Sequence, residues 1–383
     1  MTTLFKNPRQ QSASGVHTST VGVAVVGCGY WGPNLIRNFF ETAECRMAAI
    51  CDAIPERLAA MQRRHPSVVA TPRFDDLLSD PNVDAIAIAT PVQTHARLAR
   101  QALEAGKHVL IEKPMTTSSA EAEELIEIAA RRGLVLMVDH TFVYTGAVRR
   151  IKQLIDTGEL GSLYYYDSVR VNLGLVQHDV SVIWDLAAHD FSIMDHLIGG
   201  RPRGVSAVGA VHLPGGMADV AYITVLFDNN LLAHFHVNWL SPVKVRQVLI
   251  GGDRRMVLYD DIEATEKIKV YDRGVEWTDD QNEARRERLV AYRTGDMYAP
   301  KFDQGEALRT ECSHFVECIR SQRTPITDGL AGLRTVRLLE AAERSLRNAG
   351  EIERIDGLSA STSVIPAARP LTRFSPAAME ALG

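Results

Sequence analysis

The chain of 383 residues contains little cysteine and no long hydrophobic run. Its five cysteines are odd in number and form no CxxC pair, so neither a disulfide framework nor a zinc site is indicated. We therefore expect no bound metal, and a reducing cytoplasm as the location. No apolar stretch approaches the roughly 18 residues that a membrane-spanning helix needs, which argues against a membrane role.

An excess of positive charge is also missing, because the formal net charge is −5. This balance offers no general attraction to nucleic acid or to an anionic membrane surface, so neither is an expected partner. The composition is that of a globular protein, with 46% hydrophobic and 23% charged residues. A chain of this length has enough apolar surface for two domains.

The pattern along the chain divides it into four segments. Residues 1–20 are polar and lack the apolar region of a secretion signal, which indicates a flexible leader. We expect a first domain over 21–140 and a second over 141–357. Residues 358–383 contain Pro, Ser and Ala without periodicity, which is typical of a tail that lies on a surface or on a neighbouring subunit.

Strand and helix signals alternate over the first domain. Continuous apolar runs, typical of strands covered on both faces, are separated by amphipathic segments, which predicts a parallel, doubly wound sheet. One helix shows both of its ends, because Ser118 and Glu121 form a capping-box pattern and Gly133 is a typical stop. The expected strands are 21–27, 46–52, 84–90, 108–113 and 134–139.

The first expected strand runs into the sequence GCGYWG, where Gly27, Gly29 and Gly32 surround Tyr30 and Trp31. A GxGxxG turn lets the backbone approach a pyrophosphate, and the helix that follows supplies free N–H groups at its N-terminus. The pattern therefore predicts a dinucleotide site. The alternative is a glycine-rich turn without a ligand.

Asp52 ends the second expected strand, about 20 residues after the last glycine, as a dinucleotide fingerprint requires. Its carboxylate can accept both ribose hydroxyls of NAD and would repel the 2′-phosphate of NADP. NAD is therefore the expected cofactor. Two alternatives stay open: Asp52 caps a helix that begins near Pro55, or Arg57 reaches a phosphate.

Charged residues follow the apolar run of the fourth expected strand, in the sequence HVLIEKP. Ligands of an open parallel sheet bind beyond the carboxyl ends of its strands, which places Thr90, Pro91, Glu112 and Lys113 at the cofactor edge. A lysine there can stabilise an alkoxide or transfer its proton. The alternative is a surface lysine paired with Glu112.

The pattern changes from Leu163 onward, where alternating strands predict a largely antiparallel sheet. An amphipathic helix over 184–198 interrupts these strands. Asp185 and His189 are four residues apart on this helix and therefore share a face, where a carboxylate can orient an imidazole. A helix-stabilising surface pair is the alternative.

Three segments together resemble the Gfo/Idh/MocA oxidoreductase family: GCGYWG, IATPVQTHARLARQALEAGKHVLIEKP and WDLAAHD. The resemblance runs from Val21 to about Gly350. It implies a Rossmann domain over 21–140 that binds NAD or NADP. It also implies an α/β domain over 141–357 with a large, mostly antiparallel open sheet, which binds substrate and makes homodimers or homotetramers through its exposed face.

By this resemblance, Lys113, Asp185 and His189 match the catalytic residues of the family and contact its sugar substrates. The expected reaction moves a hydride from a ring secondary alcohol to NAD. His189 takes the hydroxyl proton, Asp185 orients the imidazole, and Lys113 stabilises the alkoxide. The roles of Lys113 and His189 can also be exchanged, and the sequence leaves this choice open. No metal is needed for such chemistry.

The resemblance also assigns the loops beside the nicotinamide. Thr90, Pro91 and His95 match the loop near the nicotinamide ribose, and Glu112 is expected to orient that ribose or the lysine. A cis bond before Pro114 would help to hold Lys113 in place.

Within the family, the segments GYWGPNLIRNF and WDLAAHDFSI are most similar to dehydrogenases of UDP-N-acetylglucosamine-derived uronic acids. We therefore expect oxidation at C3 of a nucleotide-linked sugar, such as a UDP-N-acetylated uronic acid. The alternatives are an inositol, aminocyclitol or free-sugar dehydrogenase, or a keto-sugar reductase. A non-catalytic NAD-binding regulator is a more remote one.

Polar residues recur along the strands of the second domain. Arg170 and Asn172 share one strand face, and Lys244 shares a face with Arg246, so these residues could supply donors and cations to a diphosphate or carboxylate. We expect Arg170, Asn172 and Lys244 to bind substrate. The other interpretation is a solvated sheet face or a subunit interface.

Overall fold

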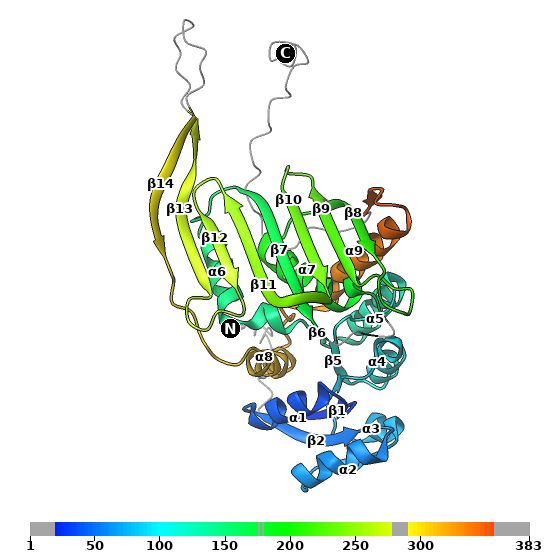
Figure 1. Cartoon of the computed structure of the whole chain (residues 1–383). Coiled ribbons are helices and arrows are strands. Elements are labelled where there is room, and N and C mark those ends of the chain that lie inside the picture. The colour runs from blue at the N-terminus through cyan, green and yellow to red at the C-terminus, as the bar shows by residue number, and fades with distance from the viewer. Residues whose placement is uncertain (1–19, 175–176, 178–179, 278–289, 356–383) are drawn as a thin grey trace, which may run out of the picture.

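The computed structural model describes residues 20–174, 177, 180–277 and 290–355 (Figure 1). The expectations for the leader and for the tail concern residues outside this part of the chain, apart from Thr20. The described residues form two sheets that differ in strand direction and in how their faces are covered.

The first sheet has six parallel strands in the order β3-β2-β1-β4-β5-β6. Both of its faces are covered: Val23 and Val25 of β1 point into one core, and Ala24 and Val26 point into the other. This double burial explains the continuous apolar runs. The elements are β1 (Val21–Val26), α1 (Gly32–Glu41), β2 (Cys45–Cys51), α2 (Pro55–Arg64), β3 (Val69–Thr71), α3 (Phe74–Ser79), β4 (Ala85–Ile88), η1 (Val92–Thr94), α4 (His95–Glu104), β5 (His108–Glu112), α5 (Ser119–Arg132) and β6 (Leu136–Asp139).

The predicted doubly wound sheet is confirmed, with one strand missed. β3 has only three residues, too few to show a periodic pattern. The ends of α5 are as expected: the Ser118 hydroxyl accepts the Glu121 N–H, and Gly133 has a left-handed φ of 65°. Such a conformation suits a residue without a Cβ atom.

The second sheet has nine strands in the order β14-β13-β12-β11-β7-β10-β9-β8-β15. All neighbouring pairs are antiparallel except β7 with β10. This confirms the expected mostly antiparallel sheet. The remaining elements are η2 (Thr141–Tyr144), α6 (Gly146–Asp156), β7 (Leu163–Leu173), η3 (Ile183–Ala187), α7 (Ala188–Ile198), β8 (Pro202–Ala210), β9 (Val220–Phe227), β10 (Leu232–Asn238), β11 (Leu240–Gly252), β12 (Met256–Asp260), β13 (Ile268–Trp277), β14 (Val290–Tyr298), α8 (Ala307–Ser321), α9 (Gly329–Arg347) and β15 (Glu353–Arg354).

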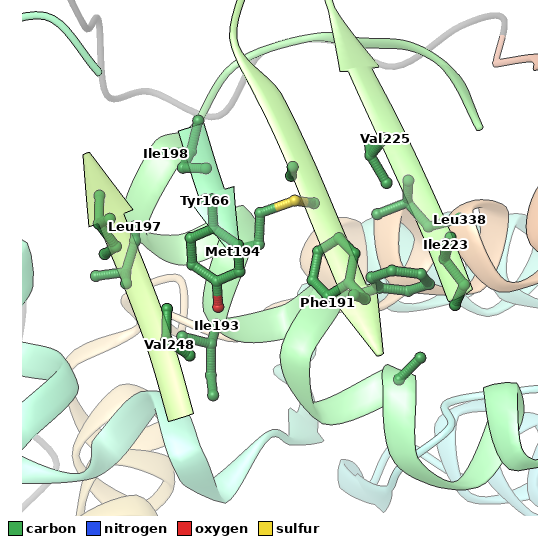
Figure 2. Close-up of a cluster of buried hydrophobic side chains, with 14 of the residues drawn as sticks. Tyr166, Phe191, Ile193, Met194, Leu197, Ile198, Ile223, Val225, Val248 and Leu338 are labelled. Carbon is green, nitrogen blue, oxygen red and sulfur yellow. The ribbon is translucent and has the colours of Figure 1, made fainter. Parts of the chain in front are cut away.

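Helices α6, α7 and α9 cover one face of this sheet, and the face toward the viewer in Figure 1 carries no helix of the described chain. The core between α7 and the sheet contains Tyr166, Phe191 and Phe235 (Figure 2). The Phe191 and Phe235 rings meet edge to face, with centroids 4.9 Å apart. Bulky rings on the inner face anchor α7, which carries His189.

Helix α8 returns to the first sheet late in the chain. Phe315 of α8 lies 6.3 Å from Phe39 of α1, ring to ring, within one core. The Arg37 guanidinium donates to both carboxylate oxygens of Glu306, at 2.9 and 2.6 Å. The domain limits at 140 and 141 remain a prediction. Helix α8 belongs to the later part of the chain and packs against the first sheet.

Helix α9 is the longest in the described chain, with 19 residues. Its buried side chains face the neighbouring helices and the second sheet. Among the described residues, no helix combines the length and the apolar character that crossing a membrane would require.

Candidate active site

The glycine turn after β1 is closed tightly. Gly27 has a φ of 96°, and a Cβ atom there would lie 2.5 Å from the carbonyl oxygen of Ala89. A Cβ atom on Gly32 would lie 1.8 Å from the carbonyl oxygen of Gly27. Gly29 is open by contrast, with only the Arg57 guanidinium 3.6 Å from its Cβ position. These constraints fit a backbone turn that receives a pyrophosphate at the start of α1.

The two aromatic residues of this turn have different surroundings. Tyr30 is exposed and stacks on Trp31, with ring centroids 6.5 Å apart. The Trp31 indole N–H donates to Asp139 Oδ2 at 3.1 Å, across the sheet edge. Trp31 is therefore held against the carboxyl end of β6, on the side where a nicotinamide would lie.

Asp52 is buried at the end of β2. Its carboxylate accepts the Cys28 N–H at 2.6 Å and the Ile54 N–H at 2.8 Å. The residue before α2 is Ile54, with no side-chain cap, so the interpretation of Asp52 as a helix cap is wrong. A carboxylate has about four acceptor positions, which leaves room for two ribose hydroxyls.

His95 packs against the loop of Thr90 and Pro91, and its place near the ribose stays a prediction. Its Nδ1 lies 2.9 Å from the Pro114 carbonyl oxygen, and its Nε2 lies 2.8 Å from the Thr90 carbonyl oxygen. Both nitrogens are thus occupied by backbone, and burial lowers the pKa of the imidazole. His95 therefore connects the loop of Thr90 and Pro91 to the turn at Pro114. The Lys113–Pro114 bond in this turn is cis, as expected.

Lys113 meets the second domain at Asp185. The Lys113 ammonium donates to the Asp185 carbonyl at 2.9 Å and lies 3.5 Å from Oδ1. The other carboxylate oxygen accepts the Trp239 indole N–H at 3.0 Å. This places a cation and a carboxylate from different domains at the cofactor edge of the first sheet.

The expected pairing of Asp185 with His189 is wrong within the described chain. His189 Nδ1 is buried and has no hydrogen-bond partner there, and Asp185 bonds instead to Lys113 and Trp239. The physical reason is local: Ile183–Ala187 forms a π-helical turn. A wider turn shifts the phase, so residues four apart no longer share a face as they do in an α-helix.

His189 lies among rings and cations. The Phe142 ring meets the imidazole edge on, with centroids 5.0 Å apart. The Arg170 guanidinium lies 4.5 Å and the Arg246 guanidinium 5.7 Å from the Phe142 ring centre. Burial first, and then the charge of Lys113, hold the pKa of His189 well below its ordinary value. The imidazole is therefore neutral near pH 7 and can accept a proton.

Glu112 belongs to a buried acidic group. Its carboxylate accepts the Lys113 backbone N–H at 2.8 Å, and it is the register partner of Asp139. Burial first, and then Asp139, raise the pKa of Glu112 and of Glu311 in α8. A carboxyl group kept neutral in this way can donate a hydrogen bond near the nicotinamide side.

Arg170 is not the free cation that was expected. It is 3% exposed and donates to both oxygens of the buried Asp190 carboxylate, at 2.9 and 3.0 Å. Asn172, two residues further along β7, is half-buried, and Lys244 on β11 is exposed. Arg246 stands opposite Arg170 in the strand register, and its buried Nε has no described partner.

Several residues of this site were not identified from the sequence. Asp139 and His140 follow the apolar run of β6 as Glu112 and Lys113 follow β5, so the same signal could have found them. Phe142 and Trp239 lack such a signal. Their place depends on how the two sheets meet.

Comparisons with known proteins agree with this geometry. Residues 21–140 match the oxidoreductase family with an NAD-binding Rossmann fold, and residues 148–258 match the Gfo/Idh/MocA C-terminal domain. UDP-N-acetylglucosamine 3-dehydrogenase of Acidithiobacillus ferrooxidans is 29% identical over 82% of this chain and 93% of its own length. The NAD(+)-dependent scyllo-inositol 2-dehydrogenase of Bacillus subtilis is 27% identical over 86% and 94%.

Solved structures give the same result for the fold. The Acidithiobacillus ferrooxidans UDP-N-acetylglucosamine 3-dehydrogenase GnnA is similar with a TM-score of 0.71 at 27% identity, over 85% of this chain and 97% of that one. GenD2 from gentamicin A biosynthesis, solved in complex with NAD, has a TM-score of 0.74 at 21% identity, over 91% and 100%.

Proposed function

The chain belongs to the Gfo/Idh/MocA family of NAD-binding oxidoreductases, whose related sequences include sugar and cyclitol dehydrogenases, and we propose that it oxidises C3 of a nucleotide-linked sugar. A UDP-N-acetylated sugar or its uronic acid is the substrate class. The observation that carries this proposal is the cluster of Lys113, Asp185 and His189 at the edge where the glycine turn ends.

In this proposal, the substrate lies between the cofactor edge and the wall of the second sheet. Bound NAD accepts a hydride from the ring carbon that carries the hydroxyl. His189 takes the hydroxyl proton, since its imidazole is neutral, and Lys113 stabilises the negative charge that develops on the oxygen. Asp185 positions the Lys113 ammonium and is itself held by Trp239.

The second sheet supplies cations for an anionic group. Arg246 faces the Phe142 ring near His189. Its Nη1 lies 3.5 Å from Asp261 Oδ2, and its buried Nε lacks a described partner. Lys244 stands two residues before it, on an exposed part of β11, and Asn172 is near on β7. We assign Arg246 and Lys244 to a diphosphate or carboxylate, and Asn172 to the sugar. A neutral cyclitol would not need these cations.

A spectrophotometric panel at the absorbance band of the reduced cofactor tests the substrate class. UDP-N-acetylglucosamine and its uronic acid, dTDP-sugars, inositols, aminocyclitols and free sugars are compared in both directions. UDP should compete with the sugar nucleotide, and calorimetry should show weaker UDP binding in Lys244→Ala and Arg246→Ala. Turnover of a free inositol without any UDP affinity would favour the cyclitol reaction, which the scyllo-inositol dehydrogenase relative represents.

We also propose that the uncovered sheet face makes a homo-oligomer. Val208, Tyr222 and Leu232 are each more than 40% exposed on neighbouring strands of that face. Tyr222 stacks on His236, with ring centroids 4.4 Å apart. Light scattering should give a dimer or tetramer that Tyr222→Arg weakens. A monomeric wild type would contradict this assignment.

A further inference from the structure

The described chain contains a cavity along α7, the helix that carries His189. Its volume is about 810 Å³, and α6, α7 and the N-terminal part of α9 line it. Ile326 and Leu330 line it and are 50% and 46% exposed, so the cavity communicates with solvent. Its size and polar wall are sufficient to admit water.

His140 lines this cavity although it is only 1% exposed. Both of its ring nitrogens are buried and have no hydrogen-bond partner among the described residues. Burial lowers the pKa of the imidazole to about 3, and the charges of Lys113 and Arg334 act in the same direction. An unpaired buried imidazole costs free energy unless water in the cavity bonds to it.

His140 also borders the catalytic cluster. Glu112 and Asp139 are register partners at the ends of β5 and β6, so the residues that follow them, Lys113 and His140, leave the sheet side by side. Two residues after His140, the Phe142 ring contacts the imidazole of His189.

Helix α7 joins the two places from the other side. Ser192 lies one turn after His189, donates to the His189 carbonyl at 2.7 Å, and lines the cavity. His140 therefore stands between the cluster and the cavity wall.

Four of the five charged groups of the cavity wall form ion pairs with one another. Arg334 donates to both oxygens of Asp195, at 2.8 Å each, and Lys152 pairs with Asp156. Asp328 accepts the Ala331 N–H and caps α9. The wall thus contains two cations and three carboxylates, so its net charge does not repel a proton that is released into the cavity.

We propose that His140 carries the proton of substrate oxidation from the catalytic cluster to this cavity. The alcohol C–H bond breaks, its hydride goes to NAD, and the O–H proton passes to the neutral imidazole of His189 as the ketone forms. That group transfers a proton to one nitrogen of His140, and the other nitrogen releases one to water. The products are the ketone, reduced NAD and a hydrated proton. The relay holds for any alcohol substrate, because it does not depend on which sugar is bound.

His140→Phe tests the relay at low buffer concentration, with the substrate that gives the highest rate in the panel above. The phenyl ring fills the same space and removes two unpaired nitrogens, so we expect an unchanged or higher melting temperature. We expect kcat for oxidation to fall at least about tenfold, with KM and NAD affinity retained. Added imidazole should restore kcat in proportion to its concentration, because a small base can enter the cavity.

His196→Phe is the matched control, since His196 is another histidine of the same wall and is half-buried. It should keep the kcat of the wild type. An undiminished kcat in His140→Phe would overturn the relay, as would a loss that imidazole does not restore, or an equal loss in His196→Phe. His140→Gln provides a second variant with the same expected loss and rescue.

Discussion

In the six-stranded sheet, the functional side chains stand where the strands end, whereas in the nine-stranded sheet they stand along the strand faces. Carboxyl ends of parallel strands meet at one edge whatever the details of register. Gly27, Asp52, Thr90 and Lys113 therefore gather at that edge. In the second sheet, a residue's place depends on which face the helices cover.

The second sheet shows this dependence on neighbouring strands. Arg170 of β7 points to the covered face and is buried against Asp190 of α7. His236 of β10 points to the uncovered face, where it stacks on Tyr222. Arg170 and His236 are both polar residues in alternating strands. The position of the helices decides that Arg170 forms a buried ion pair and that His236 forms a ring stack on the uncovered face.

The largest effect is expected for a change at Arg170. Arg170→Ala leaves the Asp190 carboxylate buried without a cation, so we expect the free energy of unfolding to fall by about 3–5 kcal/mol. Lys244→Ala, on an exposed part of β11, should change it by less than about 0.5 kcal/mol. Denaturant titration of both variants measures this. If Arg170→Ala kept its stability and lost only UDP affinity, Arg170 would be a substrate ligand.

The comparison predicts a purely kinetic effect at the edge of the first sheet. Lys113→Met should retain NAD binding and lower kcat on the order of 100-fold or more, because a preorganised charge acts mainly in the transition state. Lys107→Met is the control, since Lys107 lies just before the opposite end of β5 and donates to the carbonyls of Asp80 and Val83. Near-normal turnover in Lys113→Met would reduce Lys113 to a structural residue.

The functional edge of the first sheet could be predicted because short motifs contain their own geometry, whereas the three-residue β3 could not. A glycine turn, a strand-ending aspartate and the EKP lysine identify one edge without knowledge of the second domain. The contacts of His95 could not be predicted, because a motif position does not reveal which atoms its ring nitrogens contact. The Asp185–His189 pair was misjudged because nothing in the residues announces a π-helical turn.

A smaller effect is expected at Asp52. Asp52→Ser should weaken NAD affinity about tenfold, because the hydrogen bonds of a charged acceptor to the ribose are lost. Affinity for NADP should improve relative to NAD, since the repulsion of a phosphate is removed. Fluorescence titration of both cofactors measures this ratio. Asp84→Ser is the control, because Asp84 accepts the Gly22 N–H at the opposite edge of the sheet. A wild type that prefers NADP would refute the role of Asp52.

The smallest effect is a shift in the pH dependence of alcohol oxidation. Protonated His189 cannot accept the substrate proton, so the rate should rise with pH through the pKa of His189, which burial and the Lys113 charge hold below its ordinary value. Removing the ammonium in Lys113→Met takes away a charge that disfavours imidazolium, so the midpoint should move upward. Burial remains, so the shift should be partial. The profile of kcat/KM against pH measures the midpoint in the wild type and in the variant. A rise that persists unchanged in His189→Gln would assign the base role to Lys113. A midpoint that stays in place in Lys113→Met would show that the Lys113 charge does not affect the pKa of His189.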